Sequence, residues 1–231
     1  MAVREIKYAD NPSQRQLCVL VIDASGSMSE TVPGTGKTRI QLLNDGMRVF
    51  HSDLLNDETA SNRVRIAIVL VGGPQDDAAV MMDWTDVVDY EPFDFSPGGL
   101  TPLAQGLRLG LQIIEQEKQA LRAGGITYTR PWMFIMTDGA PTDSPADWQN
   151  ATAECQDAEA KKRCTIFPIG VDGADMAVLA QISQNPPVHM NAAKFKEFFL
   201  WLSASSSAAA KSSPGDTIQM PNINPWANVQ A

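Results

Sequence analysis

Residues 17–28 read LCVLVIDASGSM, an apolar run that stops at one carboxylate and two hydroxyls. The unbroken apolar run at 17–22 predicts a strand buried on both faces, which is usual for a central strand of a parallel sheet. Asp23, Ser25 and Ser27 follow at the carboxyl end of that strand. Ligands of open α/β sheets bind at the carboxyl ends of the strands, so these side chains stand where a binding site is expected.

Further apolar runs alternate with amphipathic segments along the chain. Strands are predicted at 64–71, 80–82, 131–136 and 165–171. Helices are predicted at 38–56, 103–114, 146–162, 176–182 and 192–202, with Thr101 as the N-cap of the second. This alternation predicts a doubly wound α/β fold, with a mostly parallel central sheet and helices on both faces. Because only a turn-rich segment precedes 80–82, we expect this run to be the one antiparallel edge strand.

Composition divides the chain into an N-terminal extension at 1–15, one domain at 16–203 and a C-terminal tail at 204–231. The tail is rich in Ser, Ala and Pro and has no periodicity, so it is expected to be disordered. The alternative is that residues 218–226 form a strap across the domain or bind a partner.

The net charge of −9 and the pI of about 4.7 argue against nucleic-acid binding, which needs a basic face. Residues 1–10 mix charged and apolar side chains, unlike a signal peptide, and no apolar stretch reaches the roughly 20 residues of a membrane helix. Three cysteines without a CxxC pair indicate packed thiols in a reducing compartment. We therefore expect a cytoplasmic protein without membrane insertion.

Two further polar segments resemble the first in their placement. Thr101 stands at the start of a predicted helix, and Asp138 follows the strand at 131–136. Each alone is explained as a cap or turn residue, but with Asp23, Ser25 and Ser27 they fall on one rim of the sheet. Two carboxylates and three hydroxyls form an all-oxygen site of the kind that hard cations prefer. The expected ion is Mg²⁺, with Mn²⁺ or Ca²⁺ as alternatives.

The segment Asp23-Ala24-Ser25-Gly26-Ser27 resembles the Asp-x-Ser-x-Ser signature of von Willebrand factor A (VWA) domains. Thr101 and the turn 137–139 resemble the second and third parts of that family's metal-ion-dependent adhesion site, and the likeness covers roughly residues 16–203. The resemblance implies that Ser25, Ser27 and Thr101 bind the metal directly. It also implies that Asp23 and Asp138 act partly through water.

Within that family, residues 98–103 and 137–143 are most similar to the stand-alone bacterial VWA proteins of the TerY type, found in tellurite-resistance and related stress clusters. The likeness implies a non-catalytic module in which Mg²⁺ captures an Asp or Glu of a protein partner, with kinase- or phosphatase-like proteins as candidate partners. The alternative is a structural or regulatory subunit of an ATPase-driven complex, chelatase-like or secretory.

A metal-dependent phosphohydrolase is the third hypothesis, but that chemistry needs a second carboxylate at position 25, which is serine. His51 and His189 are interpreted as packing or surface residues, so no catalytic residue is assigned. The Gly34–Thr38 segment lacks the first glycine of a phosphate-binding loop, since position 31 is Thr. Residues 29–37 are therefore expected to form a flexible lip before the first helix.

Overall fold

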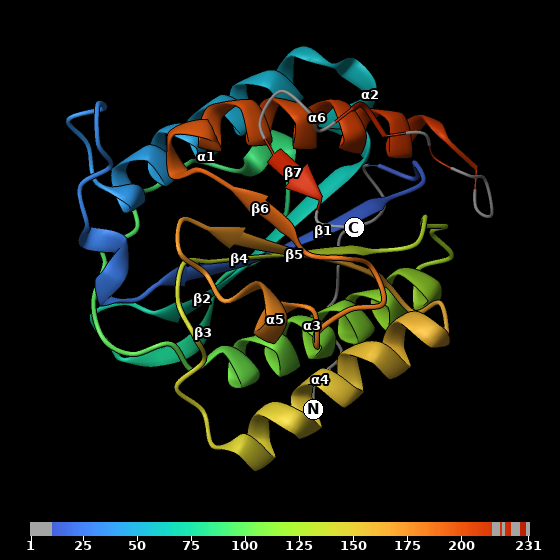
Figure 1. The fold of residues 1–231 in the computed structure, drawn as a ribbon. Coiled ribbons are helices and arrows are strands. Elements are labelled where there is room, and N and C mark those ends of the chain that lie inside the picture. The colour runs from blue at the N-terminus through green and yellow to red at the C-terminus, as the bar shows by residue number, and fades with distance from the viewer. Residues whose placement is uncertain (1–10, 214–217, 219, 223–226, 230–231) are drawn as a thin grey trace.

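The structure, a computed structural model, describes residues 11–213, 218, 220–222 and 227–229. A twisted sheet forms the middle layer, and helices cover both of its faces (Figure 1). Across the described residues the sheet has seven strands in the order β3-β2-β1-β4-β5-β6-β7. The strands are β1 (Gln16–Ala24), β2 (Val64–Gly72), β3 (Asp77–Asp86), β4 (Trp132–Thr137), β5 (Thr165–Val171), β6 (Val188–Met190) and β7 (Ala227–Val229).

Two groups of helices enclose this sheet. One face carries α1 (Arg39–Asn56), α2 (Glu58–Arg63) and α6 (Phe195–Lys211); the other carries α3 (Leu103–Ala123), α4 (Pro145–Ala160) and α5 (Met176–Leu179) (Figure 1). Strands β2, β1, β4, β5 and β6 run parallel, and β3 pairs antiparallel with β2 at one edge. The predicted fold class is therefore confirmed, including the antiparallel edge strand, which is longer than expected. The very short β6 and β7 were not predicted, because three residues carry no readable period.

Strand β1 lies in the interior of the sheet, between β2 and β4, as its sequence predicts. Leu20 and Ile22 pack in the core on the α1 and α6 face, while Val19 and Val21 pack on the α3 and α4 face. All nine residues of the strand are buried. Because helices cover both faces of the sheet, residues 17–22 are apolar without alternation. Asp23, the first polar side chain after them, lies at the carboxyl edge of the sheet.

The last helix is longer than expected, and this corrects the predicted disorder of the tail. Helix α6 continues to Lys211, so residues 204–211 are helical. Their small side chains lie in the interface, with Ser205, Ser206 and Ala209 fully buried. Small residues allow two helix backbones to approach closely: further along the same pair, a Cβ placed on Gly46 of α1 would lie 2.4 Å from Phe199 Cδ2 of α6. The Ser- and Ala-rich composition of residues 204–211 therefore serves close helix packing rather than disorder.

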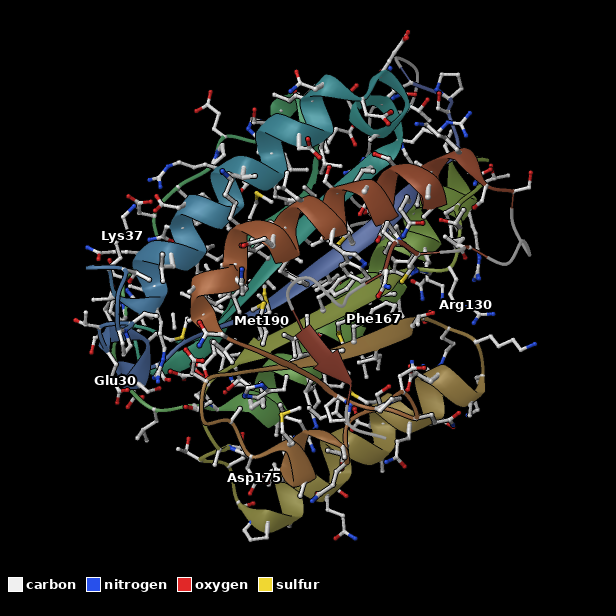
Figure 2. All side chains as sticks on the ribbon, turned by 45° about the horizontal axis from the view of Figure 1, so that its top comes forward. Glu30, Lys37, Arg130, Phe167, Asp175 and Met190 are labelled. Atoms are coloured by element: carbon white, nitrogen blue, oxygen red, sulfur yellow. The ribbon has the colours of Figure 1, made fainter. Side chains whose placement is uncertain are left out.

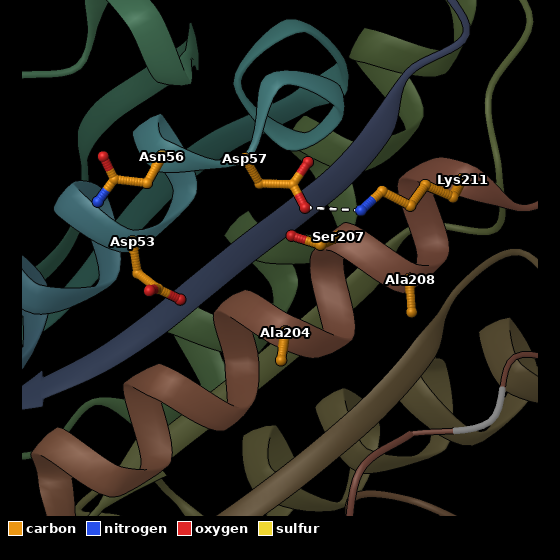
Figure 3. A pocket seen from close by; sticks show the side chains of 7 residues that line it. All are labelled: Asp53, Asn56, Asp57, Ala204, Ser207, Ala208 and Lys211. Atoms are coloured by element: carbon orange, nitrogen blue, oxygen red, sulfur yellow. Dashed lines mark hydrogen bonds and ion pairs between the residues drawn. The ribbon is translucent and has the colours of Figure 1, made fainter.

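The end of α6 is held by side chains from the segment that follows α1. Arg63 Nη1 donates to the carbonyl of Ala210 (2.7 Å), and Lys211 Nζ donates to Asp57 Oδ2 (2.7 Å; Figure 3). Within α6, Trp201 Nε1 donates to the carbonyl of Pro221 (2.7 Å), which lies beyond the helix.

Parts of the expected strap lie on the domain. Ile218 and Met220 pack against the core. Just after the expected strap, β7 pairs antiparallel with β6. Residues 219 and 223–226 of that strap, and residues 1–10 of the N-terminal extension, lie outside the described residues.

Candidate metal site

The five predicted site residues lie where three segments meet at the carboxyl edge of the sheet. Asp23 ends the apolar part of β1 and leads into a short 3-10 turn at Gly26–Ser29. Asp138 directly follows β4, the parallel neighbour of β1. The loop that carries Thr101 joins them through its backbone, because Gly26 N donates to the carbonyl of Gly99 (3.1 Å).

A chain of hydrogen bonds links the first and third segments. Asp23 Oδ1 accepts from the backbone amide of Ser25 (2.8 Å), and its Oδ2 accepts from the hydroxyl of Thr137. The hydroxyl oxygens of Ser25 and Ser27 are 3.0 Å apart, and Ser27 Oγ donates to Asp138 Oδ1 (2.6 Å). Segments more than a hundred residues apart in the chain thus share one polar network.

Thr101 completes the group from the side of Gly139. A Cβ placed on Gly139 would lie 3.6 Å from Thr101 Oγ1, 3.9 Å from Asp23 Oδ2 and 4.0 Å from Ser27 Oγ. Oxygens of the first segment and of the Thr101 loop therefore border one space beside Gly139 of the third segment, which a side chain at position 139 would enter. Ser27 in turn contacts Ser25 Oγ and Asp138 Oδ1, so two carboxylates and three hydroxyls lie in or next to this space, a donor set that suits a hard divalent cation.

The structure corrects the expected role of Thr101 as a helix cap. Helix α3 begins after Pro102, which occupies the N-cap position, and Ala104 N is satisfied by Asp143 Oδ2 (3.0 Å) instead. Thr101 N donates to Thr142 Oγ1 (3.1 Å), which fixes the backbone of the loop. Thr142 and Asp143, which belong to the stretch 137–143, thus position this loop and the start of α3, a role that their place in the sequence does not indicate.

Burial dominates the electrostatics of Asp23. It raises the pKa of Asp23 to about 6, although hydrogen bonds from Thr137 and Ser25 favour the charged form, and the nearby Asp138 adds a smaller upward contribution. Across the described part of the chain, no group of three or more His, Cys, Asp or Glu side chains is placed to hold a metal. A cation at this site would therefore depend on the hydroxyls.

Arg39 is the site residue that sequence reasoning missed. Its Nη1 donates to Asp138 Oδ2 (2.7 Å) and to the carbonyl of Ser27 (3.2 Å), and it pairs with Glu30 Oε2 (3.0 Å). Its Nε lies 3.9 Å from Asp172 Oδ2. No short-range pattern links Arg39 to a carboxylate 99 residues away.

The segment expected to be a flexible lip folds back on itself. Val32 N donates to the carbonyl of Lys37 (2.9 Å), Thr31 and Thr38 form an antiparallel bridge, and Val32 is buried. Glu30 and Lys37 lie at the same end of α1 (Figure 2). This hairpin-like segment leads directly into α1, whose capping box at Thr38 positions Arg39.

The fold and the rim of oxygens together define an α/β domain with a candidate cation site at the carboxyl edge of its sheet. A sequence profile of the von Willebrand factor type A domain matches residues 18–200. The chain therefore belongs to the VWA family, whose domains commonly mediate protein–protein interactions.

Solved structures share this fold at low sequence identity. The VWA-type domain of the type V pili tip protein Mfa5 from Porphyromonas gingivalis superposes with a TM-score of 0.61 and 14% identity, over 88% of this chain and 99% of that one. The pilus adhesin SpaC from Lactobacillus rhamnosus GG gives 0.63 and 15%, over 84% and 31%. Proximal thread matrix protein 1 from the mussel byssus gives 0.54 and 16%, over 85% and 49%.

The chain thus spans less than half the length of the byssus protein and of SpaC. No match is found among curated proteins. Where the chain is described, none of its helices has the length and apolarity needed to cross a membrane.

Proposed function

We propose that the chain is a metal-dependent protein-binding module. In this proposal the hydroxyls of Ser25, Ser27 and Thr101 and the carboxylates of Asp23 and Asp138 hold one divalent cation. Mg²⁺ is the proposed ion, and Mn²⁺ and Ca²⁺ are the alternatives. The observation that carries the proposal is the common space beside Gly139, bordered by oxygens of Thr101, Asp23 and Ser27.

The bound cation would supply an electron-poor centre for an Asp or Glu carboxylate of the partner. The protein's own carboxylates would orient the groups that hold the cation. Asp23 fixes the turn by accepting from Ser25 N, and Asp138 orients the hydroxyl of Ser27. Three neutral hydroxyls leave the cation with few direct charges, which favours an external anion as the last ligand.

The likeness of residues 98–103 and 137–143 to TerY-type proteins extends the proposal to the partner. We propose a kinase- or phosphatase-like partner in the cytoplasm of a bacterium, within a tellurite-resistance or related stress response. SpaC is described as a pilus adhesin, a binding role that is in keeping with such a module.

Binding is preferred to catalysis because no catalytic role is supported for the candidate nucleophiles and bases. The ring of His51 packs edge-on against Tyr90, with centroids 5.1 Å apart, and its Nε2 lies 3.2 Å from the carbonyl of Val87. Burial raises the pKa of the Cys155 thiol well above its ordinary value, which disfavours the reactive thiolate.

The test is partner capture from a bacterial lysate with Mg²⁺ and with a chelator. The full chain, Thr101→Ala and a matched control, Ser29→Ala, are compared. Ser29 lies in the same turn but donates to the carbonyl of Gly26 and is exposed. We expect the chelator and Thr101→Ala to remove the same partners, and Ser29→Ala to keep them. Identical partner sets in all conditions would contradict metal-dependent recognition, and an ATPase among the lost partners would favour the alternative of an ATPase-driven complex.

A further inference from the structure

Arg39, the first residue of α1, directs its guanidinium group into the candidate metal site. Its Nη1 donates to Asp138 Oδ2 (2.7 Å) and to the carbonyl of Ser27 (3.2 Å). The Arg39 side chain is 15% exposed, and that of Asp138 is fully buried. Water therefore screens this ion pair far less than it screens an ion pair on the open surface.

The ion pair engages the second oxygen of Asp138. Oδ1 accepts from Ser27 Oγ (2.6 Å), and Oδ2 accepts from Arg39 (2.7 Å). A hydrogen bond between a guanidinium and a carboxylate is about twice as strong as a neutral one. Asp138, one of the two carboxylates of the site, is thus paired with one fixed positive charge from the protein itself.

Outer carboxylates help to hold the guanidinium in this position. Glu30 Oε2 lies 3.0 Å from Arg39 Nη1, and Asp172 Oδ2 lies 3.9 Å from Nε. The Glu30 side chain is 64% exposed, so water screens its charge strongly. Arg39 is consequently tied to the turn after β1, to the turn after β4 and to the end of β5.

We propose that Arg39 sets the charge of the metal site. Its guanidinium lowers the affinity of the site for the divalent cation alone. It raises the affinity of the cation-loaded site for a carboxylate from a partner. Oxygen sites tune their affinity for divalent cations through the charge of their ligands. Arg39 offsets one of the two negative charges of Asp23 and Asp138, so a divalent cation exceeds the remaining charge by one; without Arg39 the two charges balance the cation. Glu30 and Asp172 are present in both cases, so they cancel in this comparison.

This inference rests on the metal-dependent binding proposed above, and it adds a coupling between the two ligands. An external carboxylate supplies the negative charge that Arg39 cancels, so cation and carboxylate should each strengthen the binding of the other. Thermodynamic linkage requires the two effects to be equal in size. A purely structural Arg39 would leave the size of this coupling unchanged when it is replaced.

The test is direct binding of Mn²⁺, followed by the electron paramagnetic resonance signal of the unbound ion, with and without sodium acetate as the carboxylate probe. The variants are Arg39→Met, which removes the charge, and Arg39→Lys, which keeps it. Arg48→Met is the matched control, since Arg48 lies on the same helix, is half exposed and pairs with Asp45 and Asp94. Thermal unfolding without metal checks that each variant folds.

We expect Arg39→Met to bind Mn²⁺ about tenfold more tightly than the unaltered chain, because a nearby positive charge is removed. Acetate should strengthen Mn²⁺ binding to the unaltered chain more than to Arg39→Met. Arg39→Lys and Arg48→Met should bind Mn²⁺ as the unaltered chain does. In the absence of metal, Arg39→Met should melt at a lower temperature because its ion pairs are gone, so stability and affinity move in opposite directions.

Unchanged or weaker Mn²⁺ binding by Arg39→Met would overturn the inference about Arg39. If the unaltered chain also binds Mn²⁺ and Ser27→Ala abolishes that binding, the proposed metal site survives that result. Absence of Mn²⁺ binding in every variant, with and without acetate, would overturn the metal site and the role of Arg39 together.

Discussion

Two serine-rich stretches of this chain use the same side chain in opposite ways. In residues 23–29, DASGSMS, the hydroxyls of Ser25 and Ser27 lie 3.0 Å apart and join a network with two carboxylates. In residues 203–210, SASSSAAA, the serines belong to a buried helix. There the hydroxyl oxygens of Ser205 and Ser206 have no hydrogen-bond partner among the described residues.

The difference between these stretches lies in what the backbone presents to the hydroxyl. At the end of β1 the turn directs Ser25 Oγ towards Ser27 Oγ, and Ser27 Oγ towards Asp138 after the neighbouring strand, so serine acts through its oxygen. In α6 serine acts through its small size, which allows the helix to lie close to its neighbours. Four experiments test this contrast.

The largest effect is expected from ending the chain after Ser203, which removes the last part of α6. Ser205, Ser206, Ala209 and Ala210 are buried there, so their loss exposes a face of the core. We expect the free energy of unfolding to fall by about 3–5 kcal/mol, comparable to truncating a large core side chain. Urea unfolding measures it.

A chain that ends after Ser213 is the control, because it keeps the whole of α6. It should lose less stability than the chain ending after Ser203. Equal stability of the full chain and the chain ending after Ser203 would show that residues 204–211 contribute nothing to the fold.

Much of the fold could be predicted from the sequence, but the last part of α6 could not. The strand at 17–22 and the helix that ends at Asn56 could be predicted, because each has a period or an unbroken apolar run long enough to read. Helix α6 beyond residue 203 could not, because Ser and Ala carry no hydrophobic period. What makes this part of the helix stable is the surface against which it packs, which includes α1, where Gly46 leaves room for α6.

The second effect is the stabilisation that Mg²⁺ should give through Ser27. A ligand present at a hundred times its dissociation constant stabilises the folded state by about 2.7 kcal/mol. Ser27→Ala should remove most of that gain, and should itself cost about 1.5–3 kcal/mol without metal, the usual worth of a hydrogen bond to a charged group such as Asp138. Thermal unfolding across a Mg²⁺ titration measures both quantities.

Ser29→Ala is the control in the same turn and should keep the full response to Mg²⁺. An equal Mg²⁺ response in Ser27→Ala and in the unaltered chain would remove Ser27 from the ligand set.

The candidate site was likewise only partly visible in the sequence. The five oxygen-bearing residues could be assembled because each stands at a strand end or helix start on one rim. Arg39 and Thr142 could not, because their roles depend on contacts with Asp138 and Thr101 in distant segments. The cap assigned to Thr101 was wrong because Asp143 satisfies Ala104 N instead.

The third effect is smaller and has the opposite sign. Ser205→Ala removes a buried hydroxyl whose desolvation costs about 1–3 kcal/mol when it has no partner, so stability should rise by about 1 kcal/mol. Ser207→Ala is the matched control, since it makes the same change on the same helix at a residue that lines a surface pocket (Figure 3). Both variants gain helix propensity equally, so the difference between them in urea unfolding isolates the buried hydroxyl. A stability loss in Ser205→Ala would mean that its oxygen is satisfied.

The smallest effect concerns the ion pair that closes the end of α6, between Lys211 and Asp57 (2.7 Å; Figure 3). Partial burial alone would raise the pKa of Asp57, but hydrogen bonds from Lys211 and from the amides of Ala60 and Thr59 outweigh it and hold this pKa below its ordinary value. Such a carboxylate contributes stability above its unfolded-state pKa and loses that contribution as the pH falls through its folded-state pKa.

Lys211→Met should therefore cost about 0.2–1 kcal/mol at neutral pH, the usual range for an exposed pair. The two proteins should converge in stability as the pH falls below about 3.9, the ordinary pKa of Asp, because Asp57 then becomes protonated in both. The remaining cap bonds of Asp57 to α2 are common to both chains, so they cancel in the comparison. Urea unfolding over a pH series measures the gap, and a gap that does not change with pH would mean that Lys211 stabilises α6 through its aliphatic chain rather than its charge.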